Sequence, residues 1–191
     1  MTAPAWIEVQ LAVGGALRLA VGDRRALGLF DTSIDGFWRS FRAAAICYPL
    51  YLVLLCFRVS GANWTQSGVP TILVVESIAY VVSWTAFPLL ILPLARLLGR
   101  EGRFLAFMVV YNWSQIPQSA LFVLVGLDGA SGMMTPAAAS LAQLTSAVAV
   151  LVYEWYIARV ALLVTGAQAT VVVMVDLVLG SVLSRVAAAL Y

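Results

Sequence analysis

The sequence predicts an all-α membrane protein, a polytopic bundle of about five transmembrane helices preceded by an interfacial amphipathic helix. Hydrophobic residues make up 63% of the 191 residues and charged residues only 10%, a composition far outside that of soluble domains. Long apolar stretches fill most of the chain, and the gaps between them are short. We therefore expect a transmembrane domain over residues 41–191 and an interfacial or cytoplasmic segment over residues 1–40, with no separate water-soluble domain.

The charged residues and the lack of histidine argue against several function classes. The eleven basic residues are all arginine and are dispersed along the borders of apolar stretches, whereas nucleic-acid-binding proteins gather them on one basic face. A chain without histidine lacks the usual ligand of haem and of catalytic zinc. We expect no cofactor, no metal site, no nucleic acid partner and no enzymatic activity.

The first 28 residues indicate a helix that lies along the membrane surface. Apolar residues alternate there with Glu8, Arg18 and several small residues, and the stretch ends at the charged residues 23–25. This order of basic and apolar residues is wrong for a signal peptide, whereas an amphipathic helix at the interface accommodates it. An irregular N-terminal arm is the alternative that the sequence leaves open.

Residues 30–42 predict the entry into the first span. The polar residues 31–35 suit the start of a helix, because Asp, Thr and Ser side chains cap free backbone N–H groups. Trp38 then belongs to an aromatic belt at the membrane surface, and Arg39 and Arg42 lie at the level of the lipid headgroups.

Five spans follow from the apolar stretches and the breaks between them. Pro49 predicts a kink in the first span that neighbouring helices can accommodate, and Thr135 with Pro136 forms a good start for the fourth. The expected spans cover residues 41–57, 67–98, 104–127, 135–166 and 168–191. If the N-terminus is cytoplasmic, only Arg58 and Arg185 of the eleven arginines lie outside. We therefore expect a cytoplasmic N-terminus and an external C-terminus.

Three of the spans carry polar residues to one depth. At about 1.5 Å per residue, Glu154, Asn112, Gln115 and Asp176 all lie near the middle of a hydrocarbon core about 30 Å thick. An ionisable group at that depth is costly, and it faces protein or water instead of lipid. Since Asn112 and Gln115 share one helix face, we expect that face to receive Glu154 and also Asp176.

Two further charged residues lie away from this level. Glu76 falls in the outer half of the second span, where water can reach it. Arg159 lies about 140 degrees around the helix from Glu154 and is a poor partner for it. We expect the Arg159 side chain to lie over Trp155 and to reach the cytoplasmic headgroups.

The polar residues within the spans have two interpretations. They form a proton or substrate pathway, since carboxylates at depth often mark one, or they make interhelical hydrogen bonds of order 1 kcal/mol each that fix which helices pack together. The second interpretation is favoured, because five spans lack the paired halves that many transporters show. The residues concerned are Glu154, Asp176, Asn112, Gln115 and Glu76.

Several short motifs are similar to those of a known family. They are the FDTSIDGFWRSFRAA entry into the first span, Pro117 within an aromatic and polar third span, and Trp155, Leu162, Gly166 and Ala169 around the last two spans. In these features the chain resembles the Yip family of five-span membrane proteins, in its bacterial form. The resemblance implies five spans, a cytoplasmic N-terminus and a location in the bacterial cytoplasmic (inner) membrane.

These observations lead to two expectations about function. The first is a non-enzymatic, Yip-like scaffold, assembly factor or accessory subunit, whose partners are membrane lipids and other integral membrane proteins or a second copy of the chain. The alternative is a small transporter or proton-coupled permease that uses Glu154, Asp176 and Glu76. Access of water to these carboxylates distinguishes the two, because transport needs a polar cavity and packing needs dry hydrogen bonds between helices.

Overall fold

The computed structural model describes residues 5–191, and every regular element within them is a helix, which confirms the predicted all-α class. Residues 1–4 of the predicted N-terminal segment lie outside the described part. The elements are α1 (Ala5–Ala20), η1 (Arg24–Leu29), α2 (Ile34–Ser40), α3 (Arg42–Arg58), α4 (Gly61–Ser67), α5 (Val69–Leu97), η2 (Glu101–Arg103), α6 (Phe104–Ala130), α7 (Pro136–Ala161) and α8 (Gly166–Ala188).

Within residues 5–191, four helical stretches are long and apolar enough to cross a membrane, so the chain has the character of a membrane protein. They are Ile34–Arg58, which joins α2 and α3, and the helices α5, α7 and α8. The fifth expected span corresponds to α6, which has 27 residues but does not belong to this set. The stretch YNWSQIPQS at its centre explains the difference, because it brings polar residues and a proline into the middle of the helix.

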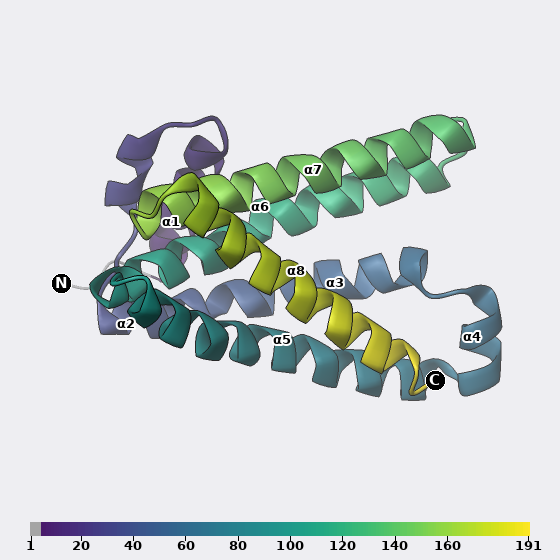
Figure 1. Ribbon diagram of the computed structural model, residues 1–191. Coiled ribbons are helices and arrows are strands. Elements are labelled where there is room, and N and C mark those ends of the chain that lie inside the picture. Colours follow the sequence, from purple (N-terminus) through teal and green to yellow (C-terminus); the bar gives the residue numbers. More distant parts are fainter. Residues whose placement is uncertain (1–4) are drawn as a thin grey trace.

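The helices form a bundle in which α6 is the most enclosed element. It packs against α1, α2, α3 and α7, while α8 packs against α7 and α5. Figure 1 shows α8 crossing diagonally from the turn after α7 to the beginning of α5. The segments α1, η1 and α2 lie at one end of the bundle, called the α1 end below, and α4 lies at the opposite end, called the α4 end.

Helix α1 covers part of the stretch predicted to be an interfacial helix, and it packs against the bundle. Three apolar residues of α1 are buried against the bundle, namely Ala12, Ala16 and Leu19. The backbone carbonyl of Ala16 accepts a hydrogen bond from the Tyr153 hydroxyl at 2.6 Å, and Glu8 forms ion pairs with Arg39 at 2.9 Å and Arg42 at 3.2 Å. This helix is therefore joined to both α2–α3 and α7.

The residues that the sequence predicts at the interface lie in this region. Trp38 is 67% exposed. Arg39 is bound not only to Glu8 but also to Asp31, and hydrogen bonds from Ser33 together with the Arg39 charge lower the Asp31 pKa. The arginines expected at the headgroups thus also hold the N-terminal elements together.

Candidate functional site

The turn between α7 and α8 determines how these two helices diverge. Thr165 and Gln168 form a reciprocal capping box at the start of α8, which satisfies backbone donors that would otherwise lack partners. The Trp155 indole N–H donates to the Gly166 carbonyl at 2.9 Å and fastens the turn to α7. Leu163 has a φ of 56°, a left-handed conformation that a leucine rarely adopts.

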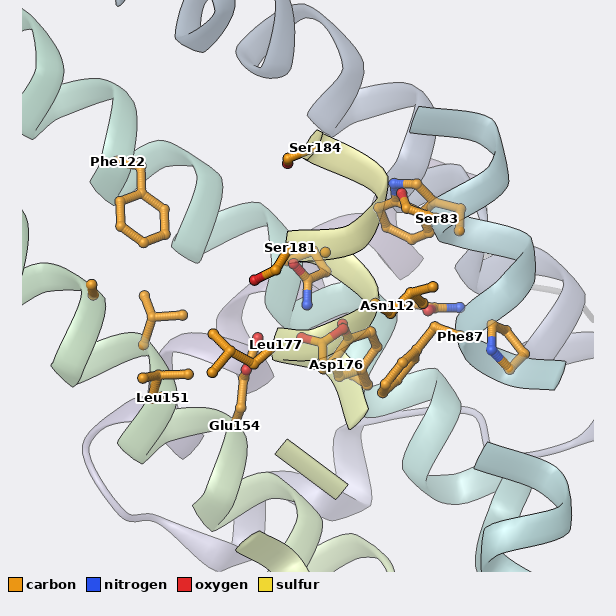
Figure 2. Close-up of a pocket in the computed structure, with 18 of the residues that line it drawn as sticks. Ser83, Phe87, Asn112, Phe122, Leu151, Glu154, Asp176, Leu177, Ser181 and Ser184 are labelled. Carbon is orange, nitrogen blue, oxygen red and sulfur yellow. The ribbon is translucent and has the colours of Figure 1, made fainter. Parts of the chain in front are cut away.

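A cavity of about 660 Å³ lies between α5, α6, α7 and α8. Glu154 of α7 and Asp176 of α8 both line it, and Figure 2 shows their carboxyl groups directed toward one another. The Tyr111 hydroxyl of α6 donates to Asp176 Oδ1 at 2.8 Å. The side chain of Glu154 is only 8% exposed, yet no hydrogen bond joins it to a donor in the described residues. Its carboxyl group faces the cavity instead.

The predicted amide partners lie beside this pair but do not bind it. Asn112 and Gln115 both line the cavity, so the depth prediction brings the right residues together. However, the Asn112 side-chain N–H donates to Ser40 on α2 at 2.8 Å, and Gln115 Nε2 is buried without a hydrogen-bond partner. Asn112 is therefore engaged by α2, whereas the Gln115 amide lies next to the Glu154 carboxyl without a well-aligned hydrogen bond to it. Sequence reasoning missed Tyr111, although it lies four residues before Gln115 on the same helix face.

The walls of the cavity combine aromatic and small residues. Phe87 of α5 and Tyr111 of α6 stack with their ring centroids 4.3 Å apart, and Trp84 lies one turn before Phe87 in the same lining. Gly180 and Ser184 of α8 also face the cavity, and no atom outside α8 lies within 4 Å of a side chain added at Gly180. These small residues therefore leave space open within the chain instead of admitting another helix.

Glu76 lies outside the cavity and belongs to a second polar cluster at the α4 end. Its side chain is 1% exposed and accepts hydrogen bonds from Arg58 at 2.5 Å, Tyr51 at 2.5 Å and Tyr191 at 2.6 Å. Arg58 also donates to Ser184 at 3.2 Å. These contacts join α3, α5 and α8, and Glu76 lies apart from the four polar residues that line the cavity.

The two clusters differ in their charge. Arg58 neutralises Glu76, whereas Arg185 is the cation in the lining of the cavity, and it lies nine residues, roughly 13 Å of helix, beyond Asp176. Burial and the neighbouring Glu76 carboxylate raise the pKa of Tyr191, which follows α8, to about 12. Arg159 lies with Cζ 5.0 Å from the Trp155 ring centroid, as the sequence predicts.

The described residues contain no group of three or more His, Cys, Asp or Glu side chains placed to hold a metal ion. Comparison with known proteins adds no identity, because no protein-family model, no curated protein and no solved structure matches the chain. Function must therefore be argued from the geometry of the cavity.

Proposed function

We propose that this protein is a small proton-linked permease whose solute pathway passes through the cavity between α5 and α8. One observation carries the proposal: the Glu154 carboxyl, which is almost fully buried, opens onto a cavity of about 660 Å³ and faces the Asp176 carboxyl there. Asp176, Asn112 and Glu76 do bond to other helices, as a packing role requires. Glu154 is therefore the residue that favours transport. A cavity at the carboxylates supports transport, since ionisable groups inside membranes mark substrate and proton pathways.

Proton coupling follows from the proximity of Glu154 and Asp176. Two carboxylates that share one poorly solvated site repel each other when both are ionised, so such a pair retains a proton between them. The Tyr111 hydroxyl donates to Asp176 and favours the charge on that partner. The pair can therefore release or take up one proton when the contents of the cavity change.

The proposal includes a membrane arrangement with five spans, α6 as the fifth. Hydropathy alone disfavours α6, but its polar residues Asn112, Ser114 and Gln118 are buried by the other helices and need not meet lipid. With α1 along the surface and the arginine-rich α1 end in the cytoplasm, the positive-inside rule is satisfied. The location proposed is the bacterial inner membrane, and a relationship to the Yip family is part of the same proposal.

Access of water to the cavity tests the proposal. The two cysteines, Cys47 and Cys56, are free thiols and are first replaced by alanine. Ser181→Cys then places a thiol in the cavity, and Val178→Cys, on the same helix but outside the cavity lining, serves as the matched control. In liposomes, we expect a membrane-impermeant thiol reagent to modify Ser181→Cys and not Val178→Cys. Equal protection of both thiols would contradict a water-accessible pathway.

A scaffold or accessory-subunit role is the second candidate. It rests on a stripe of exposed apolar side chains on α7 with the spacing of a helix-packing face, formed by Leu141, Leu144, Val148 and Val152. This face suits a helix of another membrane protein or of a second copy of the chain. Recovery of a stoichiometric partner that is lost in Leu144→Ala, with the Ser181→Cys thiol unreactive, would favour the scaffold over the permease.

A further inference from the structure

We propose that the cavity between α5 and α8 binds a monovalent organic cation, a substituted ammonium ion, in exchange for a proton. The inference rests on the proposed function and specifies the class of its solute. Three features of the cavity support it: its charge, its aromatic wall and its size.

The charge within the cavity is negative. Glu154 and Asp176 contribute carboxyl groups at its centre (Figure 2). Arg185 supplies positive charge only near the α4 end, roughly 13 Å of helix from Asp176. Asn112, which is 1% exposed, donates its N–H to Ser40, and its side-chain oxygen accepts no hydrogen bond in the described part of the chain. The donors beside the carboxyl groups are the Tyr111 hydroxyl and the Gln115 amide. Both are uncharged, so neither neutralises the carboxylates in place of a cation.

The aromatic wall suits an organic cation better than a bare metal ion. Trp84, Phe87 and Tyr111 line the side of the cavity formed by α5 and α6, and Phe87 and Tyr111 stack on one another. Aromatic rings attract ammonium groups through their negative faces, and quaternary ammonium ligands are commonly recognised in this way. The cavity volume of about 660 Å³ lies within the range of roughly 300–1,000 Å³ typical of small-molecule sites.

Proton exchange follows from the same groups. Around Glu154, the titratable or charged residues in the cavity lining are Tyr111 from α6 and Asp176 and Arg185 from α8, and α5 contributes none. When the cavity is empty, the carboxyl pair holds one proton and carries one negative charge. Binding of one ammonium ion replaces that proton, which leaves to water, so the total charge in the site is unchanged.

Calorimetric titration of the purified protein with tetraethylammonium tests the proposal, with benzoate as an anion of comparable size. We expect tetraethylammonium to bind with release of close to one proton and benzoate not to bind. Glu154→Gln and Asp176→Asn should each weaken the cation by roughly tenfold or more, which corresponds to about 1.4 kcal/mol. Asp128→Asn, an exposed acid on α6, is the matched control and should leave binding unchanged.

A second measurement needs no change to the carboxyl pair. In the background without native cysteines, tetraethylammonium should slow modification of Ser181→Cys by roughly threefold or more when it is present at several times its Kd. A reactive Ser181→Cys that tetraethylammonium does not protect would overturn the cation proposal while leaving the permease proposal intact. Binding of benzoate that disappears in Arg185→Gln would likewise replace the cation with an anion. An unreactive Ser181→Cys would refute the permease itself.

Discussion

The ion pair of Glu76 and Arg58 provides the sharpest test of how the α4 end is held together. Glu76→Gln keeps the shape of the side chain but removes its charge, so it places an amide N–H₂ or a neutral oxygen opposite the Arg58 guanidinium. Removing one partner of a buried pair costs about 3–5 kcal/mol. Because the Arg58 side chain is 42% exposed, water screens the charge left behind. We therefore expect a loss of about 2 kcal/mol in the free energy of unfolding.

The contribution of Tyr191 can be separated by a double-mutant cycle. Tyr191→Phe removes one hydrogen bond to a charged group, for which we expect about 1.5 kcal/mol. In the Glu76→Gln background the same bond is neutral, so the loss should fall to about 0.5–1 kcal/mol. The coupling energy of the pair is then of order 0.5–1 kcal/mol.

Equilibrium unfolding in mixed micelles, followed by tryptophan fluorescence, measures these energies. Glu101→Gln is the matched control, because Glu101 pairs with Arg96 at 2.8 Å on the surface, where both side chains are more than half exposed. Such a pair is worth about 0–1 kcal/mol. The reasoning is wrong if Glu76→Gln costs no more than Glu101→Gln, or if Tyr191→Phe costs the same in both backgrounds.

Three further predictions use the same unfolding assay. Because its pKa is raised from 10.0 to about 12 in the folded protein, Tyr191 contributes stability that is complete below pH 10 and lost as the pH rises through 12, so the wild type should lose stability there more steeply than Tyr191→Phe. An equal loss in both proteins would exclude Tyr191 as the cause. Gly36→Ala places a Cβ 1.9 Å from the Asp31 carbonyl oxygen and should lower the free energy of unfolding by about 2–4 kcal/mol. Gly28→Ala is its control and should cost much less, because a Cβ added at Gly28 meets no atom within 4 Å. Leu163→Gly removes the strain of the left-handed backbone, about 1–2 kcal/mol, so the free energy of unfolding should be equal or higher. If Leu163→Gly lowers it as much as Leu163→Val does, the turn is not strained.

The rise of a helix per residue predicts how deep each residue lies in the membrane, and depth alone identifies four polar residues of the cavity lining. Glu154, Asp176, Asn112 and Gln115 were placed at one level from residue numbers alone, and the structure brings all four to one cavity. The rotation of each helix about its axis could not be read in the same way. It decides that Asn112 bonds to Ser40 and that the Glu154 carboxyl remains open to the cavity.

The second cluster could have been found from the hairpin between α3 and α5. Residues equally far from the centre of a short connection face each other in antiparallel helices, and Tyr51 and Glu76 stand in that relation across the segment 59–68. The sequence pattern instead predicts that Arg58 lies on the outer side of the membrane, because this residue follows the end of an apolar stretch. Tyr191 carried no local signal, since only the diagonal path of α8 brings it to α5.

Hydrogen bonds hold α8 near both of its ends, so a tilt of this helix about one end would displace the residues along it in proportion to their distance from that end. Its start is joined to α7 by the bond between Trp155 and Gly166, and the residue Tyr191 beyond its far end is joined to Glu76. Asp176 lies ten residues along the 25 that separate Gly166 from Tyr191, so a tilt about the turn moves it by about two fifths of the displacement at Tyr191. Release of the far end by 5 Å, about one helical turn, would thus separate Asp176 from Glu154 by about 2 Å. A displacement of α8 at the α4 end would in this way reach the carboxyl pair.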